Sequence, residues 1–340
     1  MNLAFPLAVA VMYWSLPIGA LLYRIRFLNV FGPRNDMLEW AEMMRAFLGV
    51  RFKLVGQRRL HKGERMVYLA NHRSWADFFL DVWTTEARCS IMSRWMVFFA
   101  FPVFMASVIV LRGIVLFKRG KIKDKDAFNA WLDKTLDRQV NSGSLLLYPE
   151  GTRNTKPHAL PLKRGMLKYS WSRGLPFQII VTTNKERVLS EKKMAVKFGV
   201  TCCTGFSEVI ESKRYKDDFD GFMEEVQRVW DKEWAEVYKA AAEPEKLEDL
   251  TIPSPDGFDY LPSMKLLQVL VTLLTIAVFS AMVVGSAYAL GLVVPAAQDA
   301  WKYASYVLAS MPILGLASKL LGGSKVGAIK YPGLASKKID

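Results

Sequence analysis

Long apolar runs lie at both ends of the chain, and the segment between them alternates between apolar and polar positions. At the N-terminal end, residues 3–23 carry no charged side chain. As a helix that rises about 1.5 Å per residue, this run can cross a bilayer core of about 30 Å. The basic residues follow the run and do not precede it, so the pattern favours a retained signal anchor over a cleaved signal peptide.

Two more uncharged runs, residues 266–298 and 303–318, lie near the C-terminus. The first is long enough to span a bilayer and the second is short, and together they predict a helical hairpin. Because lysines follow the hairpin, the positive-inside bias places the middle of the chain and the C-terminus in the cytosol. The last four residues, 337–340 (KKID), resemble the dilysine signal that returns membrane proteins to the endoplasmic reticulum.

The middle of the chain predicts an α/β layer fold, because short apolar runs alternate with helical patterns. An amphipathic helix is predicted over 36–48. Strands are predicted over 51–55, 66–70, 113–117, 144–148 and 177–183, and helices over 74–84, 125–140 and 219–237. The uncharged run 95–111 contains Pro102, and we interpret it as a membrane-dipping or acyl-binding helix. A full crossing there would put the flanking motifs on opposite sides of the bilayer.

Composition narrows the possible functions. Hydrophobic residues make up 51% of the 340 positions, which excludes disorder for most of the chain. Three cysteines are too few for a disulfide framework, and three scattered histidines do not predict a metal site. The net charge of +14 predicts acidic partners. The apolar runs favour anionic lipid over nucleic acid, for which no recognised binding motif is present.

The segment NHRSWAD, residues 71–77, directly follows a predicted strand. Positions five apart on a helix point about 140° away from one another, so His72 can meet Asp77 only from the loop before the helix. Ser74 would then be the N-cap. In this geometry Asp77 accepts a hydrogen bond from one imidazole nitrogen and leaves the other as a base. The alternative is a capping box of Ser74 and Asp77, with His72 an ordinary loop residue.

Two segments offer cations for a phosphate. The apolar strand that starts at Gly113 ends in Lys118 and Arg119, which is also typical of a solvated basic strand end. In YPEGTR, residues 148–153, a buried strand breaks into a turn. Gly151 allows the backbone to bend and Arg153 offers a bidentate fork for phosphate. Glu150 can orient that fork or a neighbouring amide, although a simple turn is the alternative.

The ordered set of motifs is more specific than any member of it. Asn-His-x-x-x-x-Asp, a glycine-led strand ending in arginine, Pro-Glu-Gly-Thr-Arg and the strand led by Pro176 follow one another within residues 69–181. This set resembles the glycerolipid acyltransferase family, and NHRS resembles its lysophosphatidate-specific members in the eukaryotic endoplasmic reticulum. The resemblance implies a mixed β-sheet flanked by helices, to which the apolar runs add transmembrane helices at both ends.

The resemblance also implies roles for individual residues. It makes His72 the catalytic base and Asp77 its partner. It assigns the acceptor phosphate to Lys118, Arg119, Glu150, Gly151, Thr152, Arg153 and Lys163, with Asn71, Ser74, Gly113 and Pro176 in support. The implied reaction moves an acyl group from acyl-CoA to the sn-2 hydroxyl of lysophosphatidic acid, giving phosphatidic acid. Acyl-CoA is then a co-substrate, and no cofactor or metal is expected.

These predictions divide the chain into five parts: an anchor helix at 1–24, a cytosolic acyltransferase domain at 25–242, a linker at 243–262, a transmembrane hairpin at 263–322 and a basic tail at 323–340. The protein is expected in the endoplasmic reticulum membrane with its catalytic domain facing the cytosol. Two alternatives remain open. The acceptor could be another lysophospholipid or glycerol 3-phosphate, or the protein could be a non-catalytic anchor that holds anionic lipid.

Overall fold

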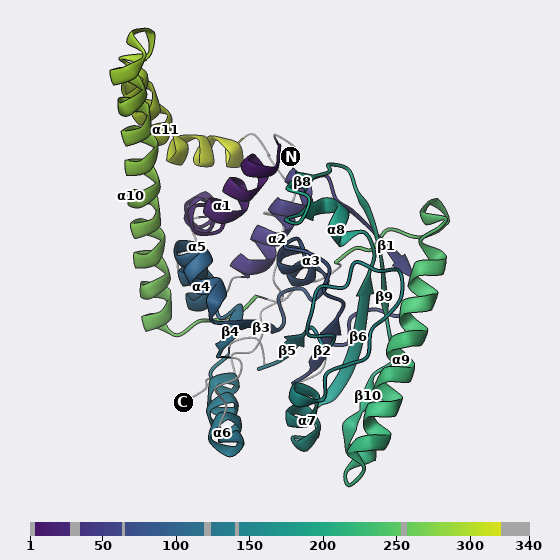
Figure 1. Ribbon diagram of the computed structural model, residues 1–340. Coiled ribbons are helices and arrows are strands. Elements are labelled where there is room, and N and C mark those ends of the chain that lie inside the picture. The colour runs from purple at the N-terminus through teal and green to yellow at the C-terminus, as the bar shows by residue number, and fades with distance from the viewer. Residues whose placement is uncertain are drawn as a thin grey trace.

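The computed structural model describes residues 4–27, 35–62, 65–118, 124–139, 143–252 and 257–320. The predicted basic tail, its dilysine sequence and Arg119 lie outside the described residues. Figure 1 shows a sheet with helices packed on both faces and the long helix α10 along one side of the molecule.

The sheet is mixed, as expected, with strand order β1-β9-β6-β2-β5-β3-β4 and the short β10 paired to β6. Its strands are β1 Arg51–Val55, β2 Val67–Ala70, β3 Ser90–Arg94, β4 Ile114–Phe117, β5 Leu145–Leu147, β6 Pro176–Thr182, β9 Thr201–Phe206 and β10 Ile210–Glu211, with the hairpin β7 Leu189–Ser190 and β8 Ala195–Val196 beside it. β9 and β10 each run antiparallel to β6, and the other pairs in the main sheet are parallel.

Helices cover both faces of this sheet (Figure 1). They are α1 Ala4–Phe27, α2 Asp36–Phe47, α3 Asp77–Thr84, α4 Met96–Ala100, α5 Pro102–Val110, α6 Lys125–Asp137, α7 Arg164–Ser172, α8 Lys185–Val188, α9 Phe219–Ala240, α10 Pro262–Val293 and α11 Ala300–Leu320; single 3-10 turns occur at η1 Ser212–Tyr215, η2 Pro244–Lys246 and η3 Pro295–Ala297. Side chains of β2 alternate between two cores. Tyr68 faces the α2 and α3 side, whereas Val67 and Leu69 face α9.

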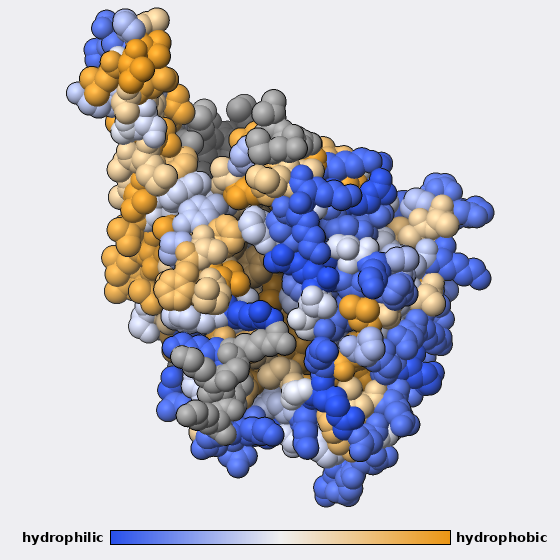
Figure 2. All heavy atoms as spheres, in the orientation of Figure 1, coloured by the Kyte–Doolittle hydropathy of each residue, from blue (hydrophilic) through white to orange (hydrophobic). Residues whose placement is uncertain are grey.

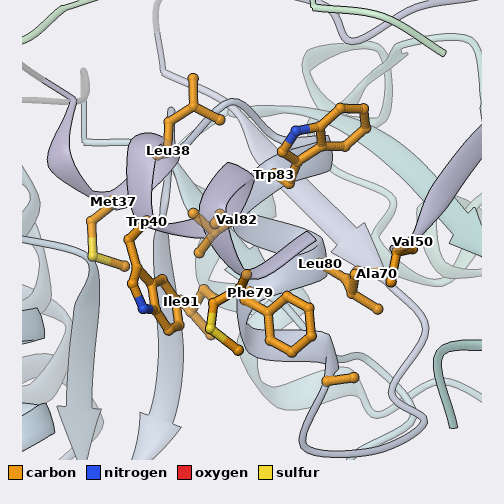
Figure 3. Close-up of a cluster of buried hydrophobic side chains, with 14 of the residues drawn as sticks. Met37, Leu38, Trp40, Val50, Ala70, Phe79, Leu80, Val82, Trp83 and Ile91 are labelled. Carbon is orange, nitrogen blue, oxygen red and sulfur yellow. The ribbon is translucent and has the colours of Figure 1, made fainter. Parts of the chain in front are cut away.

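The core on the α3 side is built mainly from aromatic and branched side chains (Figure 3). Phe79 and Leu80 of α3 are fully buried, and Trp40 of α2 contacts the Phe79 ring edge-on. Burying one such side chain stabilises the fold by about 1.5–3 kcal/mol. This packing fixes α3 against the sheet and thereby holds the N-terminal end of α3 close to the end of β2.

The uncharged run 95–111 forms two short helices, α4 and α5, and no single long one. The break falls at Phe101, because the ring of Pro102 disfavours helical backbone in the preceding residue. Helices of five and nine residues are too short to cross a bilayer. Trp95, Met96 and Phe99 are exposed at this place.

Within the described residues, α10 is the single helix long and apolar enough to cross a membrane. In α1 the apolar part of the described sequence is shorter, Ala4–Leu16, so a second span at the N-terminus is not confirmed. One face of α1 packs on the domain through Phe5, Ala8 and Met12. α11 packs against both α10 and α1.

The predicted linker is partly docked on the domain. The Leu54 N–H donates to the Glu248 carbonyl at 2.9 Å, and the Leu250 N–H donates to the Phe52 carbonyl at 2.9 Å. These two bonds pair the segment with the outer edge of β1. Further along, the Tyr260 hydroxyl donates to the Leu111 carbonyl at 3.1 Å. Both ends of this segment are therefore attached to the sheet domain.

Candidate active site

The loop after β2 is fixed to the neighbouring strand by Asn71. Its side-chain amide donates to the Thr182 carbonyl at 2.9 Å and accepts from the Thr182 N–H at 3.0 Å. Asn71 therefore satisfies the backbone of Thr182 where β6 ends, at the carboxyl end of two parallel strands. In open α/β sheets this edge is where ligands bind. His72 follows at that edge.

His72 and Asp77 are in direct contact. The imidazole Nδ1 lies 2.6 Å from Asp77 Oδ2. The same carboxylate also accepts the backbone N–H groups of Arg73 and Ser74. Asp77 is buried, whereas about a quarter of the His72 side chain, 24%, is exposed. The contact occupies Nδ1, so Nε2 is the imidazole nitrogen left for a substrate.

The helix that carries Asp77 begins three residues later than predicted. α3 starts at Asp77 itself, and the preceding residues form a turn in which Ser74 Oγ accepts from the Ala76 N–H at 3.1 Å. Ser74 also donates to the Lys185 carbonyl at 3.1 Å. Asp77 reaches back to the Ser74 N–H, as a capping box would require, while it contacts His72. Only this half of a capping box forms, because Ser74 Oγ accepts from the Ala76 N–H and the N-cap of the helix is Ala76. His72, in contrast, contacts Asp77 as the first interpretation requires.

A buried ammonium group lies next to the pair formed by His72 and Asp77, which we call the dyad. Lys185 Nζ is fully buried and lies 2.9 Å from both carboxylate oxygens of Asp81. It also donates to the Asn71 carbonyl at 2.5 Å and lies 3.7 Å from Asp77 Oδ1. Two carboxylates therefore share one cation in a site that water does not reach.

These surroundings shift the pKa values of the two carboxylates, Asp77 and Asp81, in opposite directions. Burial alone would raise the pKa of Asp77, but the Lys185 ammonium, His72 and the Arg73 N–H together hold that pKa below its usual value. Burial raises the pKa of Asp81 to about 6, against the opposing effect of Lys185. Asp77 is thus kept ionised beside the imidazole.

Lys185, Asp77 and Asp81 form a charge cluster, and Tyr148 contacts both this cluster and the His72 imidazole. Its hydroxyl donates to Asp81 Oδ2 at 2.9 Å, and its ring stacks on the His72 ring with 4.3 Å between centroids. Burial raises the pKa of Tyr148 well above its usual value, so the phenol stays protonated and acts as a donor. Tyr148 therefore restricts the imidazole from one face.

The PEGTR turn joins the same loop. The Asn154 N–H donates to the His72 carbonyl at 2.7 Å. Glu150 accepts from the Asn154 amide at 3.0 Å and from the Leu160 N–H at 2.8 Å, so it orients a neighbouring amide and not Arg153. The carboxylate that holds Arg153 is Glu191, which the sequence did not indicate.

Gly151 and Lys163 lie against each other in this turn. Gly151 has φ of +68°, a conformation that side chains other than glycine's rarely adopt, and a Cβ there would come within 3.1 Å of Lys163 Cγ. The Lys163 N–H donates to the Pro149 carbonyl at 2.8 Å. Thr152 is exposed beside them. The predicted phosphate-binding residues 150–153 and Lys163 are therefore brought together.

Other predicted residues are not brought to this place. Pro176 starts β6, and the site adjoins the far end of that seven-residue strand, about 20 Å away at about 3.3 Å per residue. Gly113 precedes β4 and packs against Met37, at the amino end of that strand, whereas Lys118 follows its carboxyl end. Lys118 therefore lies at the same end of the parallel strands as His72 but three strands away in the sheet order.

Two residues in the charge cluster were missed from sequence for different reasons. Asp81 lies four residues after Asp77, so helical spacing alone places it on the same face. Lys185 follows β6 in a segment without a motif, and only the fold brings it under the dyad. No group of three or more potential metal ligands occurs within the part of the chain that the structure describes.

Comparisons with known proteins agree with the motif set. Residues 51–181 match the family described as Acyltransferase. The chain is 26% identical over 147 residues to human 1-acyl-sn-glycerol-3-phosphate acyltransferase beta, which covers 43% of this chain and 51% of that protein. This chain thus spans about half the length of the curated relative that it matches. The resemblance to glycerolipid acyltransferases inferred from the motifs is confirmed.

A solved structure shows the same fold. The 1-acyl-sn-glycerophosphate (LPA) acyltransferase PlsC from Thermotoga maritima matches with a TM-score of 0.54 at 15% sequence identity. The match covers 69% of this chain and 95% of that one. The mixed sheet flanked by helices is therefore shared with a solved acyltransferase.

Proposed function

We propose that the acyltransferase-family domain over residues 51–181 transfers a fatty acyl group from acyl-CoA to the sn-2 hydroxyl of lysophosphatidic acid, giving phosphatidic acid. The observation that carries this proposal is the contact of 2.6 Å between His72 and Asp77 on a loop that is hydrogen-bonded to the PEGTR turn. A base and a phosphate-binding arginine are thereby held on adjoining segments.

The chemistry needs no covalent enzyme intermediate. His72 Nε2 takes the proton of the sn-2 hydroxyl as its oxygen attacks the thioester carbonyl carbon. The C–O bond forms, the C–S bond breaks, and the departing thiolate of coenzyme A receives the proton from the imidazolium. Asp77 stays ionised and stabilises the imidazolium while the charge is on it.

Arg153 is the residue that we assign to the acceptor phosphate. Its guanidinium is held by Glu191, and its Nε is buried without a hydrogen-bond partner in the described part of the chain. A phosphate oxygen would satisfy such a donor, because guanidinium and phosphate form strong charge-assisted bonds. Lys163 adds a second cation, and Lys118 is a candidate three strands away at the same end of the sheet. Arg119, which the sequence also indicates, lies outside the described residues.

The acyl chain has an apolar groove close to the dyad loop. A cavity of about 420 Å³ is lined by Phe5, Pro6, Val9, Ala10, Tyr13, Trp14 and Met194. Phe5 stacks on Trp75, with 6.5 Å between centroids, and Trp75 lies three residues after His72. Phe101, at the break between α4 and α5, contacts Trp75 edge-on. We assign this groove to the fatty acyl chain.

The apolar surface supports a membrane location. Figure 2 shows hydrophobic residues gathered along α10 and over the adjoining helices, whereas hydrophilic residues predominate on the opposite side of that view. Leu270, Leu274 and Met282 of α10 are more than half exposed. Such a surface is unfavourable in water and favourable in lipid. We place the protein in the endoplasmic reticulum membrane with the sheet domain in the cytosol.

The test is an acceptor panel. Membranes that contain the protein receive labelled acyl-CoA and, separately, lysophosphatidic acid, lysophosphatidylcholine or glycerol 3-phosphate. We expect labelled phosphatidic acid from the first and a loss of at least about a hundredfold in His72→Ala at equal protein abundance. Preference for another acceptor would correct the substrate, and no transfer to any acceptor would leave the non-catalytic anchor.

A further inference from the structure

Glu191 joins the phosphate-binding arginine to the loop that carries the base. It follows β7 in the β7–β8 hairpin. Its Oε1 accepts from Arg153 Nη1 at 2.5 Å, and its Oε2 accepts from the Trp75 N–H at 3.2 Å. The Glu191 side chain is 12% exposed and that of Arg153 is 35% exposed. One carboxylate thus occupies two donors from separate motifs.

The Trp75 N–H differs from its neighbours in the turn before α3. The N–H groups of Arg73 and Ser74 donate to Asp77, and that of Ala76 donates to Ser74 Oγ. Those three bonds are local and hold the dyad in place. The Trp75 N–H instead donates to a side chain 116 residues away, which a rotation of that side chain would release.

We propose that Glu191 is a placeholder for the acceptor phosphate, which rests on the proposed function because Arg153 is its phosphate-binding residue. A phosphate monoester brings three acceptor oxygens and nearly two negative charges, so it competes well for the guanidinium. The approaching phosphate also repels the carboxylate of Glu191. Glu191 then leaves Arg153 and, in the same movement, releases the Trp75 N–H.

The released N–H can serve the reaction. During attack on the thioester, negative charge develops on the carbonyl oxygen, and a backbone N–H aimed at that oxygen stabilises it. Binding of the acceptor would therefore complete the catalytic site. Before the acceptor binds, the Trp75 N–H is bonded to Glu191 and cannot stabilise that oxygen, so water hydrolyses acyl-CoA only slowly. Other enzymes likewise assemble their site only when the correct substrate binds.

Two substitutions at Glu191 test this with opposite expectations for a placeholder and for a structural support. Glu191→Gln removes the charge, and Glu191→Ala removes the whole carboxylate. If Glu191 is a placeholder, each variant should bind short-chain lysophosphatidic acid about three- to tenfold more tightly in calorimetry, with a matching fall in KM. If Glu191 only supports Arg153, binding weakens and KM rises, and the proposal is overturned.

A second readout tests the release of the Trp75 N–H. Without any acceptor, Glu191→Ala should release free coenzyme A from acyl-CoA several times faster than the wild type. Glu191→Gln keeps an oxygen that can accept from Trp75, so its hydrolysis should stay near that of the wild type. Unchanged hydrolysis in Glu191→Ala would overturn the link between the placeholder and the oxyanion.

Controls separate this inference from the proposed function. Glu208→Gln makes the same chemical change in the exposed ion pair with Arg58 and should leave binding and KM unchanged. Arg153→Ala should weaken acceptor binding and abolish the gain from Glu191→Gln. If the wild type transfers no acyl group, or if Arg153→Ala binds the acceptor normally, the proposed function fails. If both behave as expected but Glu191→Gln weakens binding, only the placeholder fails.

Discussion

The Lys185 ammonium determines the electrostatics beneath the dyad. The groups that face it are Asp77 and Asp81 from α3, the Asn71 carbonyl, and the ring of Tyr148. Arg73, on the same loop as His72, is engaged by Glu186 and by two backbone carbonyls, so it does not replace Lys185. Among the groups that lower the pKa of Asp77, Lys185 therefore has the largest effect, and His72 and the Arg73 N–H add to it.

Lys185→Met should impair catalysis in a pH-dependent way. Without the ammonium, burial raises the pKa of Asp77, so activity that requires an ionised Asp77 is lost at a higher pH. We expect the acid limb of the kcat/KM profile to move upward and stability to fall by about 3–5 kcal/mol. Lys232→Met, at an exposed pair on α9, is the matched control.

Because that variant could unfold, Lys185→Met combined with Asp81→Leu provides a second test. Replacing a buried ion pair by apolar side chains is often neutral for stability, so this variant should fold. It should still show the shifted acid limb, since Asp77 again lacks its cation. A normal pH profile in the folded double variant would contradict the role given to Lys185.

Asp81 should make stability depend on pH. Its folded-state pKa of about 6 lies above the ordinary value of 3.8, so protonation favours the folded state. This contribution to the free energy of unfolding is fully present below pH 3.8 and is lost as the pH rises through about 6. Urea unfolding in detergent should show this loss, with a slope of at most about 1.4 kcal/mol per pH unit. Asp81→Asn should reduce this slope and leave the part that comes from buried Glu233, whose pKa is also raised, whereas exposed Asp137→Asn should leave the slope unchanged.

At the scale of elements, the close approach of α9 to β9 depends on Gly205, which has no side chain. A Cβ at Gly205 would overlap Val237 and Glu233 of α9. Burial also raises the pKa of Glu233 to about 7, which agrees with a helix face pressed against the sheet. The antiparallel pair of β6 with β9 is thus covered directly by α9.

Gly205→Ala should destabilise the domain by about 1–3 kcal/mol, the usual cost of overpacking a well-filled interior. Thermal or urea unfolding in detergent measures it. Gly165→Ala in α7 is the control, because a Cβ there meets no atom within 4 Å and alanine favours helix. Equal stability of the two variants would show that α9 can move away from β9.

The elements with strong patterns were predictable and the others were not. β1 was predicted to the residue because its alternation reflects one buried face. For the His72–Asp77 contact, helix geometry gave only the condition that His72 lie in the loop before the helix, and the capping box remained an alternative. β3 and β9 were missed because serine, cysteine and glycine interrupt the branched and aromatic pattern typical of strands. The Arg153–Glu191 pair could not be predicted, since it joins two turns by tertiary packing alone.

For the molecule as a whole, α10 is expected to decide membrane association. Leu274 is 66% exposed and lies near the middle of the helix. Arginine there should cost about 2.5–3.5 kcal/mol on insertion, so Leu274→Arg should release more protein from membranes in alkaline extraction. Leu274→Ala is the control, and full retention of Leu274→Arg would show that α10 is not the main anchor.

The pairing of residues 248–250 with β1 also affects how the chain can be shortened. β1 is the outermost strand on its side, and this later segment supplies the hydrogen bonds for its free edge. A chain cut at residue 242 would keep every motif of the proposed active site but expose an open strand edge, which invites aggregation through edge-to-edge pairing. Soluble versions for crystallography or assays should therefore continue at least through Leu250.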